Sequence, residues 1–423
     1  MKYAIVTLGC KVNQFESQAI EGMLRSDGHT PAEKGDADVV IVNSCAVTAE
    51  SGRKSRQAVR RLMKEHPRAF AAVCGCWSQL SPAEAAELGA KVVFGSGDRA
   101  GFVKAVERAA AETAVDNPFR RNKIEQLPGG ALEGRTRAYL RIEDGCDNFC
   151  AYCVIPYARG RVRSMPPEEL SAEAERLQEE SFRELVITGI EISSYGKDLK
   201  GDVGLADAVK AVSAGAPEAR LRLGSLEPTV VTDAFCAAIA DCGNVCPHFH
   251  LSLQSGCDRT LAAMRRKYDT SGFAAAAERL RRAFPDCALT ADLITGFPGE
   301  TEEDFSDTLE FIRSIAFSAM HIFPFSPRPG TPAADMDGQL PRAVREARAA
   351  LARSIAAEMR ERYLDSQIGK TLSVLFETES EGAWQGHSGN YLLVTAKGEA
   401  LHGFMRNVQI LRRNKEKLIG IIV

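Results

Sequence analysis

The sequence predicts an α/β protein built from several domains. Apolar strands alternate with amphipathic helices through most of the 423 residues, which indicates parallel sheets with crossover helices. On a prior of about 100–200 residues per domain, this length corresponds to two to four domains. Hydrophobic residues make up 45% and charged residues 26% of the chain. This balance is typical of folded globular proteins and excludes the disordered and fibrous classes.

The first predicted unit, residues 1–116, is Rossmann-like. Strands are expected at 3–7, 39–43, 70–73 and 91–94, and helices at 17–26, 53–64 and 98–112. Ser81 and Glu84, with Pro82 at the first helical position, have the pattern of a capping box and predict another helix start. Residues 117–134 mix Pro, Gly and charged residues without apolar periodicity and predict a linker.

The second predicted unit, residues 135–365, is an open, incomplete barrel of six βα units. Its strands are expected near 138–142, 184–189, 220–224, 248–253, 287–292 and 318–323. In such barrels the loops after the carboxyl ends of the strands carry the chemistry. The helical run 340–366 ends this unit. Residues 366–423 hold short strands at 371–377, 391–395 and 408–411 broken by Gly, which predict a small β-barrel.

Charge and cysteine content narrow the function. The chain carries 53 Lys and Arg against 56 Asp and Glu, so a polyanion must be met by local basic patches. No apolar run approaches the roughly 18 residues of a membrane span, and the first residues lack a signal-peptide core, so we expect a cytoplasmic protein with no membrane contact. Twelve cysteines are many for a reducing compartment, where clustered thiols more often hold metal or do redox chemistry.

One cysteine triad directly follows the first barrel strand. Cys146, Cys150 and Cys153 stand in the string GCDNFCAYC, at spacings of four and three. Three thiolates occupy three irons of a [4Fe–4S] cluster and leave the fourth open to a substrate or cofactor. A zinc knuckle is the alternative, although zinc sites usually close with a fourth ligand and the nearby sequence offers none.

A second set of cysteines lies at three strand ends of the first unit. Cys10, Cys45 and Cys76 each follow a predicted strand, and parallel neighbours end at the same edge of a sheet. These thiols can therefore converge into a second three-cysteine site. Cys74 competes with Cys76 for the third position, and isolated buried cysteines are the plain alternative.

The motifs resemble two known groups. Cys-x-x-x-Cys-x-x-Cys at the first barrel strand looks like the radical S-adenosylmethionine (SAM) superfamily. The strings TLGCKVNQFES, NSCAVT, GCWSQ and GCDNFCAYCVIPYARGRVRS resemble the methylthiotransferase family along essentially the whole chain. The opening TLGCKVNQ and the string DGCDNFC are most similar to the branch that acts on N6-threonylcarbamoyladenosine beside the tRNA anticodon. The isopentenyladenosine branch and the branch modifying a ribosomal-protein aspartate differ around these two motifs.

This resemblance implies a set of domains and cofactors. Residues 1–116 would be the methylthiotransferase N-terminal domain with an auxiliary cluster, 135–365 the radical SAM domain, and 366–423 a TRAM RNA-binding barrel. The implied cofactors are two [4Fe–4S] clusters and SAM, with Cys76 rather than Cys74 as the third auxiliary ligand. The implied metal ligands are Cys10, Cys45, Cys76, Cys146, Cys150 and Cys153, of which the last three are also catalytic.

The implied reaction is methylthiolation. One SAM methylates a sulfur held on the auxiliary cluster, and a second is cleaved to a 5′-deoxyadenosyl radical that activates C2 of the modified adenine. Isopentenyladenosine or a ribosomal aspartate would be the substrate of a close alternative. A non-catalytic RNA-binding or electron-transfer iron–sulfur protein is an alternative of another class.

The resemblance also suggests residues around SAM. After the second strand, Gly189 would let the backbone approach the cofactor, and Glu191 stands where the family usually has His or Asn. The expected cofactor contacts follow the barrel strands and are Thr188, Gly189, Glu191, Ser225, Glu227, Gln254, Asp292, Ile294, Gly296 and Phe323. His248, His250 and His321 could imitate a metal site, but packing or substrate contacts are the preferred interpretation.

The implied partners are a tRNA anticodon stem-loop, an electron donor such as flavodoxin or ferredoxin, and a sulfur donor. Basic clusters recur at 53–61, 159–163, 265–267 and 412–415. The cluster from Arg159 to Arg163 lies directly beyond the cysteine loop, and we expect it to hold phosphates near an extruded base. Trp384, Tyr391 and Phe404 of the small barrel would add stacking contacts with single-stranded or looped RNA.

Overall fold

The computed structural model describes residues 1–129 and 136–423. Positions 130–135, which include the end of the predicted linker and the first residue of the predicted second unit, lie outside the described residues. The domain boundaries expected from the sequence remain predictions, and the observed sheets each fall within one of the predicted units.

The first sheet contains six parallel strands in the order β2-β1-β3-β4-β5-β6. These strands are β1 (Lys2–Thr7), β2 (Thr30–Pro31), β3 (Val39–Ser44), β4 (Phe70–Gly75), β5 (Ala90–Phe94) and β6 (Glu112–Ala114). The connecting helices are α1 (Lys11–Ser26), α2 (Ala49–Glu65), α3 (Cys76–Leu80), α4 (Pro82–Glu87) and α5 (Arg99–Arg108). Buried apolar clusters cover both faces of this sheet, which confirms the Rossmann-like prediction.

Two details of this unit differ from the sequence predictions. Helix α5, expected to run to Glu112, ends at Arg108, and Glu112 is instead the first residue of strand β6. Helix α4 does start at Pro82, but no side chain caps it. The Glu84 carboxylate instead accepts from Trp77 Nε1 at 2.9 Å and from Arg56 Nη1 at 3.1 Å, so tertiary partners take the group that a capping box would use.

The second unit contains two parallel sheets that together form the incomplete barrel. One has the order β11-β10-β7 and the other β12-β13-β14-β15, and an isolated parallel bridge joins Leu221 of β11 to Val245, three residues before β13. The strands are β7 (Arg137–Arg141), β10 (Glu184–Thr188), β11 (Arg220–Leu223), β12 (Ser225–Leu226), β13 (His248–Gln254), β14 (Ala288–Thr295) and β15 (Ala319–Pro324). Two short strands, β8 (Glu143–Asp144) and β9 (Arg163–Ser164), pair antiparallel beside the cysteine loop.

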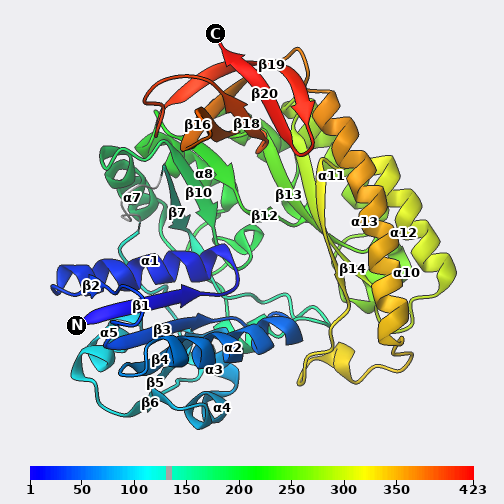
Figure 1. Ribbon diagram of the computed structural model, residues 1–423. Coiled ribbons are helices and arrows are strands. Elements are labelled where there is room, and N and C mark those ends of the chain that lie inside the picture. Colours follow the sequence, from blue (N-terminus) through cyan, green and yellow to red (C-terminus); the bar gives the residue numbers. More distant parts are fainter. Residues whose placement is uncertain (130–135) are drawn as a thin grey trace.

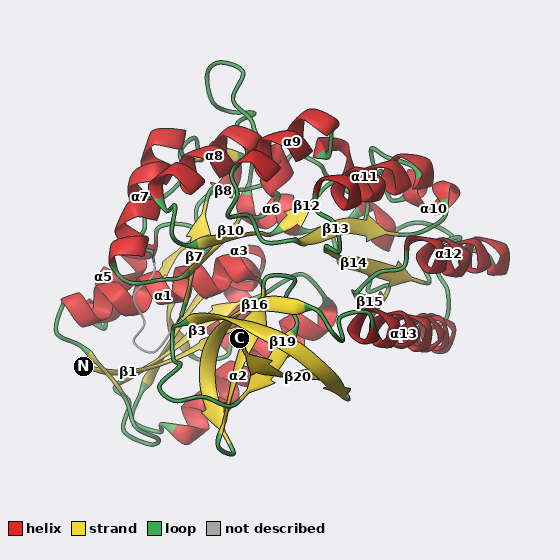
Figure 2. Cartoon of the chain, turned by 90° about the horizontal axis from the view of Figure 1, so that it is seen from above, coloured by secondary structure: helices red, strands yellow, loops and turns green. Residues whose placement is uncertain are grey.

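Helices form the outer layer of this barrel. Figure 2 shows them as an arc outside strands β7 to β15. The helices of this arc are α7 (Pro167–Glu179), α8 (Leu205–Gly215), α9 (Asp233–Asp241), α10 (Asp258–Ala263), α11 (Thr270–Ala283), α12 (Glu302–Ile315) and α13 (Arg342–Asp365). The short helix α6 (Ile155–Arg159) lies inside the arc and contacts α3 of the Rossmann-like unit. The 3₁₀ turns are η1 (Pro118–Arg120), η2 (Ile192–Ser194), η3 (Pro228–Val230) and η4 (Pro332–Ala334). Alternate strand residues such as Leu140, Leu185 and Leu221 pack under these helices. The residues between them therefore face the barrel lumen.

The last unit is a closed five-stranded barrel in the order β16-β17-β18-β20-β19. Its strands are β16 (Thr371–Ser380), β17 (Ala383–Ser388), β18 (Leu393–Ala396), β19 (Met405–Asn414) and β20 (Lys417–Ile422). The small barrel was predicted, but β17 and β20 were not. Within the described part of the chain, no helix combines the length and the apolar character needed to cross a membrane.

The C-terminal barrel docks where the lumen strands begin, above the lumen in Figure 1. Arg220 and Arg222 donate to the backbone carbonyls of Ser373, His387, Ser388 and Gly389. Both guanidinium groups also bind the buried Glu184 carboxylate, at 2.6 and 2.8 Å. These arginines hold the pKa of Glu184 well below its usual range despite the opposing effect of burial. A buried ion cluster therefore attaches the C-terminal barrel to the lumen wall.

Candidate active site

The first cysteine set lies at one edge of the Rossmann-like sheet. Cys10 follows β1 and precedes α1, Cys45 directly follows β3, and Cys76 opens α3 after β4. Ser44 pairs with Gly75 in the register of β3 and β4, so Cys45 and Cys76 come next at the same level. A Cβ added at Gly9 would lie 3.0 Å from Cys45 Sγ, because the turn before Cys10 packs on Cys45. The structure thus brings the three residues to one place.

Cys76 and Cys74 occupy different environments. Burial raises the pKa of Cys76 to about 12, and the nearby thiols of Cys45 and Cys10 add to this rise while Arg159 opposes it. Cys74 packs on the opposite face of the sheet with Phe94 and Phe102. Burial raises its pKa to about 11, and neither of the other two cysteines contributes. The third member of the group is therefore Cys76.

The second cysteine set lies in the loop after β8. The Cys146 amide donates to Gly160 O at 3.0 Å, and the Cys153 amide donates to Cys150 O at 2.9 Å. Burial raises the pKa of Cys153 to about 12, with a further contribution from Cys150. Burial also raises the pKa of Cys146, to which both other thiols contribute. The loop therefore places Cys146, Cys150 and Cys153 together at the barrel mouth.

Gly145 allows this loop to close. Its φ is +91°, and a Cβ there would lie 1.9 Å from Arg161 O. Gly145→Ala should destabilise the fold by about 1–3 kcal/mol in urea unfolding and lower the iron content after anaerobic reconstitution. The control is Gly22→Ala within α1, where no atom lies within 4 Å of the added Cβ. That variant should keep its iron and gain up to about 1 kcal/mol. Equal iron content in the two variants would contradict the role given to Gly145.

The donor sets fit iron–sulfur clusters. Among the described residues, no three His, Cys, Asp or Glu side chains are grouped so that they could hold a single metal ion. A cubane attaches each thiolate to a different iron, so its ligands stand further apart than those of one ion. Each set offers three thiols at an interface between elements. In each set, one thiol also accepts from a buried guanidinium group, which is how proteins stabilise the negative charge of such sulfurs.

Arg159 and Arg266 supply those hydrogen bonds. Arg159 Nε donates to Cys76 Sγ at 3.2 Å, and Arg266 Nη1 donates to Cys150 Sγ at 3.0 Å. Arg266 also pairs with Glu227 at 2.8 Å and lies over the Tyr268 ring. Residue type alone gave no sign of these contacts, because each arginine and its cysteine are more than 80 positions apart.

Arg159 belongs to a buried ion network between the Rossmann-like unit and the barrel. Its guanidinium group donates to Glu16 and also pairs with Asp144 at 3.5 Å. Arg99 Nη2 donates to Glu16 at 2.8 Å, and Arg163 Nη2 donates to Asp144 at 2.9 Å. Burial opposes ionisation of Glu16, yet these arginines lower its pKa to about 2. The network joins α1, α6 and the paired strands β8 and β9.

The prediction that Arg159 to Arg163 hold phosphates is wrong for two of its three arginines. Arg159 and Arg163 are buried and paired with carboxylates. Arg161 is the exposed member, with 67% of its side chain accessible. Burial decides this outcome, because an unpaired guanidinium group inside the protein would lose its hydration without compensation.

The residues expected around SAM mostly follow the lumen strands. Thr188, Glu227 and Gly296 are buried, Gln254, Asp292 and Ile294 are half-buried along β13 and β14, and Ser225 and Phe323 are exposed. Gln254 has a φ of +66° at the end of β13. In the register of β14 and β15, Asp292 pairs with His321 and Ile294 with Phe323, so these four share one stretch of wall.

Two glycines in this set are explained by side chains of the chain itself. A Cβ at Gly189 would lie 2.3 Å from Glu143 Oε1, and one at Gly296 would lie 2.4 Å from Arg345 Cγ. Packing against Glu143 thus gives a reason for glycine at position 189, and the expected approach of a cofactor to its backbone stays a prediction. Burial raises the pKa of Glu143 well above its ordinary value.

Glu191 lies beside the second cysteine set. Its side chain accepts from the Ser193 amide at 3.2 Å, and its own amide donates to Glu143. Burial and the charge of Glu227 raise the pKa of Glu191 to about 7, while Arg266 opposes the rise. Glu191 also contributes to the raised pKa of Cys146. A carboxylate that burial and a like charge disfavour is suited to a cationic partner.

The three histidines do not form one group. His250 bonds Thr290 at 3.0 Å and lies 3.5 Å from Asp292, and its ring centre is 6.2 Å from that of His321. His248 is buried against the Tyr391 ring, and burial lowers its pKa. These contacts agree with the packing interpretation.

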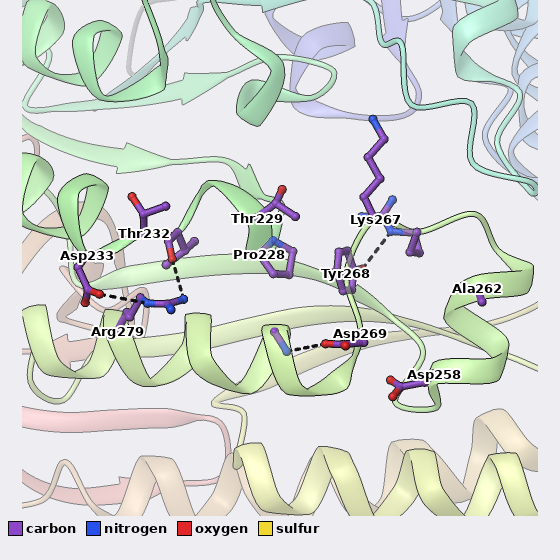
Figure 3. A pocket seen from close by; sticks show the side chains of 13 residues that line it. Pro228, Thr229, Thr232, Asp233, Asp258, Ala262, Lys267, Tyr268, Asp269 and Arg279 are labelled. Atoms are coloured by element: carbon purple, nitrogen blue, oxygen red, sulfur yellow. Dashed lines mark hydrogen bonds and ion pairs between the residues drawn. The ribbon is translucent and has the colours of Figure 1, made fainter.

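Two cavities adjoin the site, and none of the residues expected to hold metal or SAM lines either of them. The larger, of about 890 Å³, lies between η3, α10 and the start of α11 (Figure 3). There Arg279 reaches Asp233 at 3.5 Å and Val231 O at 3.3 Å, so its polar groups largely satisfy one another. The smaller, of about 300 Å³, opens at the junction of the three units and is lined in part by Lys11. No sequence pattern predicts this smaller cavity, because its walls come from three separate parts of the chain.

The aromatic residues of the C-terminal barrel have different environments. Trp384 belongs to the barrel core. Tyr391 faces the smaller cavity, below the Arg222 guanidinium group at 4.7 Å. Phe404 is 50% exposed and lies under Arg406 at 5.0 Å. Tyr391 is 40% exposed, so it and Phe404 both have the exposed ring that stacking with RNA needs, whereas Trp384 does not.

Comparison with protein families gives two matches. The model described as "Radical SAM superfamily" matches residues 140–312, and the one described as "Uncharacterized protein family UPF0004" matches residues 2–95. These segments contain the barrel triad and the sheet-edge triad, respectively.

Curated relatives span almost the whole chain. "Threonylcarbamoyladenosine tRNA methylthiotransferase MtaB" of Bacillus subtilis is 36% identical over 97% of this chain and 93% of its own length. The protein of the same name from Thermotoga maritima is 36% identical over 98% and 96%. "tRNA-2-methylthio-N(6)-dimethylallyladenosine synthase" of Caldicellulosiruptor saccharolyticus is 32% identical over 100% and 92%.

Among solved structures, the fold resembles the radical SAM methyltransferase TsrM of Kitasatospora setae in its complex with tryptophan and a SAM analogue. The TM-score is 0.58 at 15% identity, covering 79% of this chain and 75% of that one. At this identity the likeness concerns the fold alone.

Proposed function

We infer the function from one premise: the chain belongs to the family of radical SAM tRNA methylthiotransferases. We propose that it inserts a methylthio group at C2 of N6-threonylcarbamoyladenosine next to the tRNA anticodon, giving 2-methylthio-N6-threonylcarbamoyladenosine. The observation that carries this proposal is the presence of two separate three-cysteine sets, one at the edge of the Rossmann-like sheet and one in the loop after β8. A simple radical SAM protein needs one such set, whereas sulfur insertion uses two.

The proposal assigns the cysteines to two [4Fe–4S] clusters. Cys146, Cys150 and Cys153 hold the cluster that binds SAM, and Cys10, Cys45 and Cys76 hold the auxiliary one. Together with an electron, the first cluster and SAM supply the 5′-deoxyadenosyl radical that this superfamily uses. Three ligands on each cluster leave one iron free, for SAM in one case and for sulfur in the other.

The remaining residues of the site stabilise the cluster thiolates and bind SAM. Arg159 and Arg266 stabilise one thiolate of each set through the N–H donors already described. Glu191 accepts from the methionine ammonium group of SAM, which supplies the cation that its environment calls for. Thr188, Ser225, Gln254, Asp292, Ile294, Gly296 and Phe323 line the rest of the SAM pocket in this proposal, with Glu227 held by Arg266.

The proposed reaction on tRNA also implies the binding partners. A tRNA anticodon stem-loop is the substrate, and the exposed Phe404 with Arg406 on the C-terminal barrel provides a stacking and phosphate contact. An electron donor such as flavodoxin or ferredoxin and a separate sulfur donor complete the reaction.

The choice of substrate rests on the relatives. Relatives named for threonylcarbamoyladenosine are 33–36% identical to this chain, and relatives named for dimethylallyladenosine are 31–35% identical. The two ranges overlap, but the two relatives at 36% both carry the threonylcarbamoyladenosine name. Dimethylallyladenosine, the same nucleoside as isopentenyladenosine, is therefore the second candidate.

Turnover with purified protein tests the proposal. The chain, reconstituted anaerobically with iron and sulfide, is incubated with SAM, dithionite and tRNA bearing either N6-threonylcarbamoyladenosine or isopentenyladenosine. Mass spectrometry of the nucleosides should find 2-methylthio product on the first tRNA. Product on the second tRNA alone would overturn the choice of substrate, and absence of 5′-deoxyadenosine would indicate a non-catalytic iron–sulfur protein.

A further inference from the structure

The smaller cavity lies at the opposite end of the lumen from the barrel cysteines. Arg137, at the start of β7, lines it, while the cysteine loop comes after the end of that strand. At about 3.3 Å per residue, the five residues of β7 separate the two places by roughly 13 Å. Lys11 brings the other cysteine set into the same region, because it follows Cys10 directly and its side chain lines the cavity.

The cavity has a cationic wall whose guanidinium groups are already paired. Arg137 Nη2 donates to Glu377 Oε1 at 2.6 Å, and Arg222 Nε donates to the Glu184 carboxylate at 2.8 Å. Both guanidinium groups also lie over the Tyr391 ring, at 5.6 and 4.7 Å. Neither needs a further anion.

Lys11 is different. Its amine has no hydrogen bond or ion pair with any described residue, although it is half-buried and lies near Arg137 and Arg222. A half-buried ammonium group with like charges beside it gains more from an added anion than a solvated one does. Among the described cavity-lining residues, Lys11 is therefore the cation that a ligand would pair with.

We propose that the cavity receives the N6 substituent of the target nucleoside and that Lys11 Nζ binds the carboxylate of that substituent. This inference rests on the proposed function. C2 and N6 project from different corners of the adenine ring, so a base that presents C2 to the cysteines directs its N6 group elsewhere in the lumen. The junction cavity, whose lining includes Tyr139 of β7 and Val186 of β10, offers space for that group.

The lining also selects against an apolar substituent. Besides Lys11, it includes Arg137, Arg222, Thr136 and Glu377, with Val186 as its aliphatic member. A dimethylallyl group placed there would bury Lys11 without an anion and desolvate polar groups without replacing their hydrogen bonds. The same lysine thus accounts for acceptance of one nucleoside and rejection of the other.

Binding measurements isolate the carboxylate from the chemistry. The ligands are two anticodon stem-loops, one with N6-threonylcarbamoyladenosine and one with its methyl ester, which removes the charge. A hydrogen bond to a charged group implies that the wild-type holoprotein binds the acid about 10- to 100-fold more tightly than the ester. Lys11→Met should bring this ratio close to one without weakening binding of the ester, and Lys11→Arg should keep most of it.

Lys104→Met is the matched control, because Lys104 is exposed on α5, away from the cavity. It should retain the wild-type ratio. Iron content and the urea midpoint of each variant verify that the site beside Cys10 is intact. A Lys11→Met protein that still prefers the acid would overturn the inference. Equal weakening of acid and ester would also overturn it, because Lys11 would then contact an RNA phosphate.

The turnover assay separates this failure from that of the proposed function. If the wild-type protein methylthiolates the threonylcarbamoyl substrate but Lys11→Met leaves the acid-to-ester binding ratio unchanged, the inference about Lys11 is wrong and the proposed function is supported. If the wild-type protein gives no product on that substrate and binds the acid and the ester equally, both the inference about Lys11 and the proposed function are wrong.

Discussion

Alanine in place of Cys76 should abolish methylthio insertion while the protein still cleaves SAM. In the proposed assignment, Cys76 supplies one of three thiols to the auxiliary cluster, whereas Cys146, Cys150 and Cys153 lie in a separate loop. A tripod reduced to two ligands should not retain its cluster, so the sulfur source is lost while the SAM site persists. Liquid chromatography with mass spectrometry, following 5′-deoxyadenosine and the 2-methylthio nucleoside together, checks both halves of this expectation.

Cys74→Ala is the matched control for that experiment. Cys74 is two residues away and equally buried, but it packs on the opposite face of the sheet. Its loss should cost stability in the range of a small core truncation, about 1 kcal/mol, and leave product formation intact. If Cys74→Ala lost the product and Cys76→Ala kept it, the ligand assignment would be reversed.

Arg159→Met should destabilise the fold through the buried ion network. The change removes one guanidinium partner from both Glu16 and Asp144. Arg99 still pairs with Glu16, Arg163 still pairs with Asp144, and Arg141 lies within 4 Å of both carboxylates. Breaking a buried pair costs about 3–5 kcal/mol where the remaining charge is uncompensated, so with these partners in place we expect a loss of about 1.5–3 kcal/mol. Urea unfolding under anaerobic conditions measures this change.

A spectroscopic readout distinguishes this residue from an ordinary structural one. Removing the N–H donor to Cys76 Sγ should shift the midpoint potential of the auxiliary cluster to a more negative value, followed by electron paramagnetic resonance during redox titration. Arg161→Met is the control, since Arg161 lies in the same loop, is exposed and pairs with Asp147 at 3.3 Å. It should cost less than about 1 kcal/mol and leave the potential unchanged. Similar effects of the two variants would refute the role given to Arg159.

The sequence was sufficient for features that depend on local pattern and strand order. The sheet-edge cysteines come together because β1, β3 and β4 are parallel neighbours, an arrangement that alternating strands and helices predict. The grouping of Cys146, Cys150 and Cys153 does not depend on strand order, since these three thiols belong to one loop. The resemblance to known motifs chose Cys76 over Cys74, and the two faces of β4 give the physical basis for that choice.

Features that depend on distant partners could not be predicted in the same way. Arg159 and Arg163 looked like phosphate ligands because their charge is visible in the sequence, whereas their carboxylate partners are not. Glu16 is 143 positions from Arg159, and Asp144 is 19 positions from Arg163 across the pairing of β8 with β9. The capping pattern at Ser81 failed because Glu84 bonds Trp77 instead. The junction cavity needs Lys11, Arg222 and Tyr391 from three separate units, and no periodicity in any one unit reveals it.

Arg222 has a consequence for how RNA engagement and nucleoside choice depend on one another. The same guanidinium group lines the junction cavity and donates to the carbonyls of Ser388 and Gly389 in the C-terminal barrel. Displacing that barrel would therefore dismantle one wall of the cavity. In the proposed function, binding of the anticodon arm to the C-terminal barrel and binding of the N6 substituent in the cavity are therefore thermodynamically linked. Each binding event strengthens the other by the same free energy.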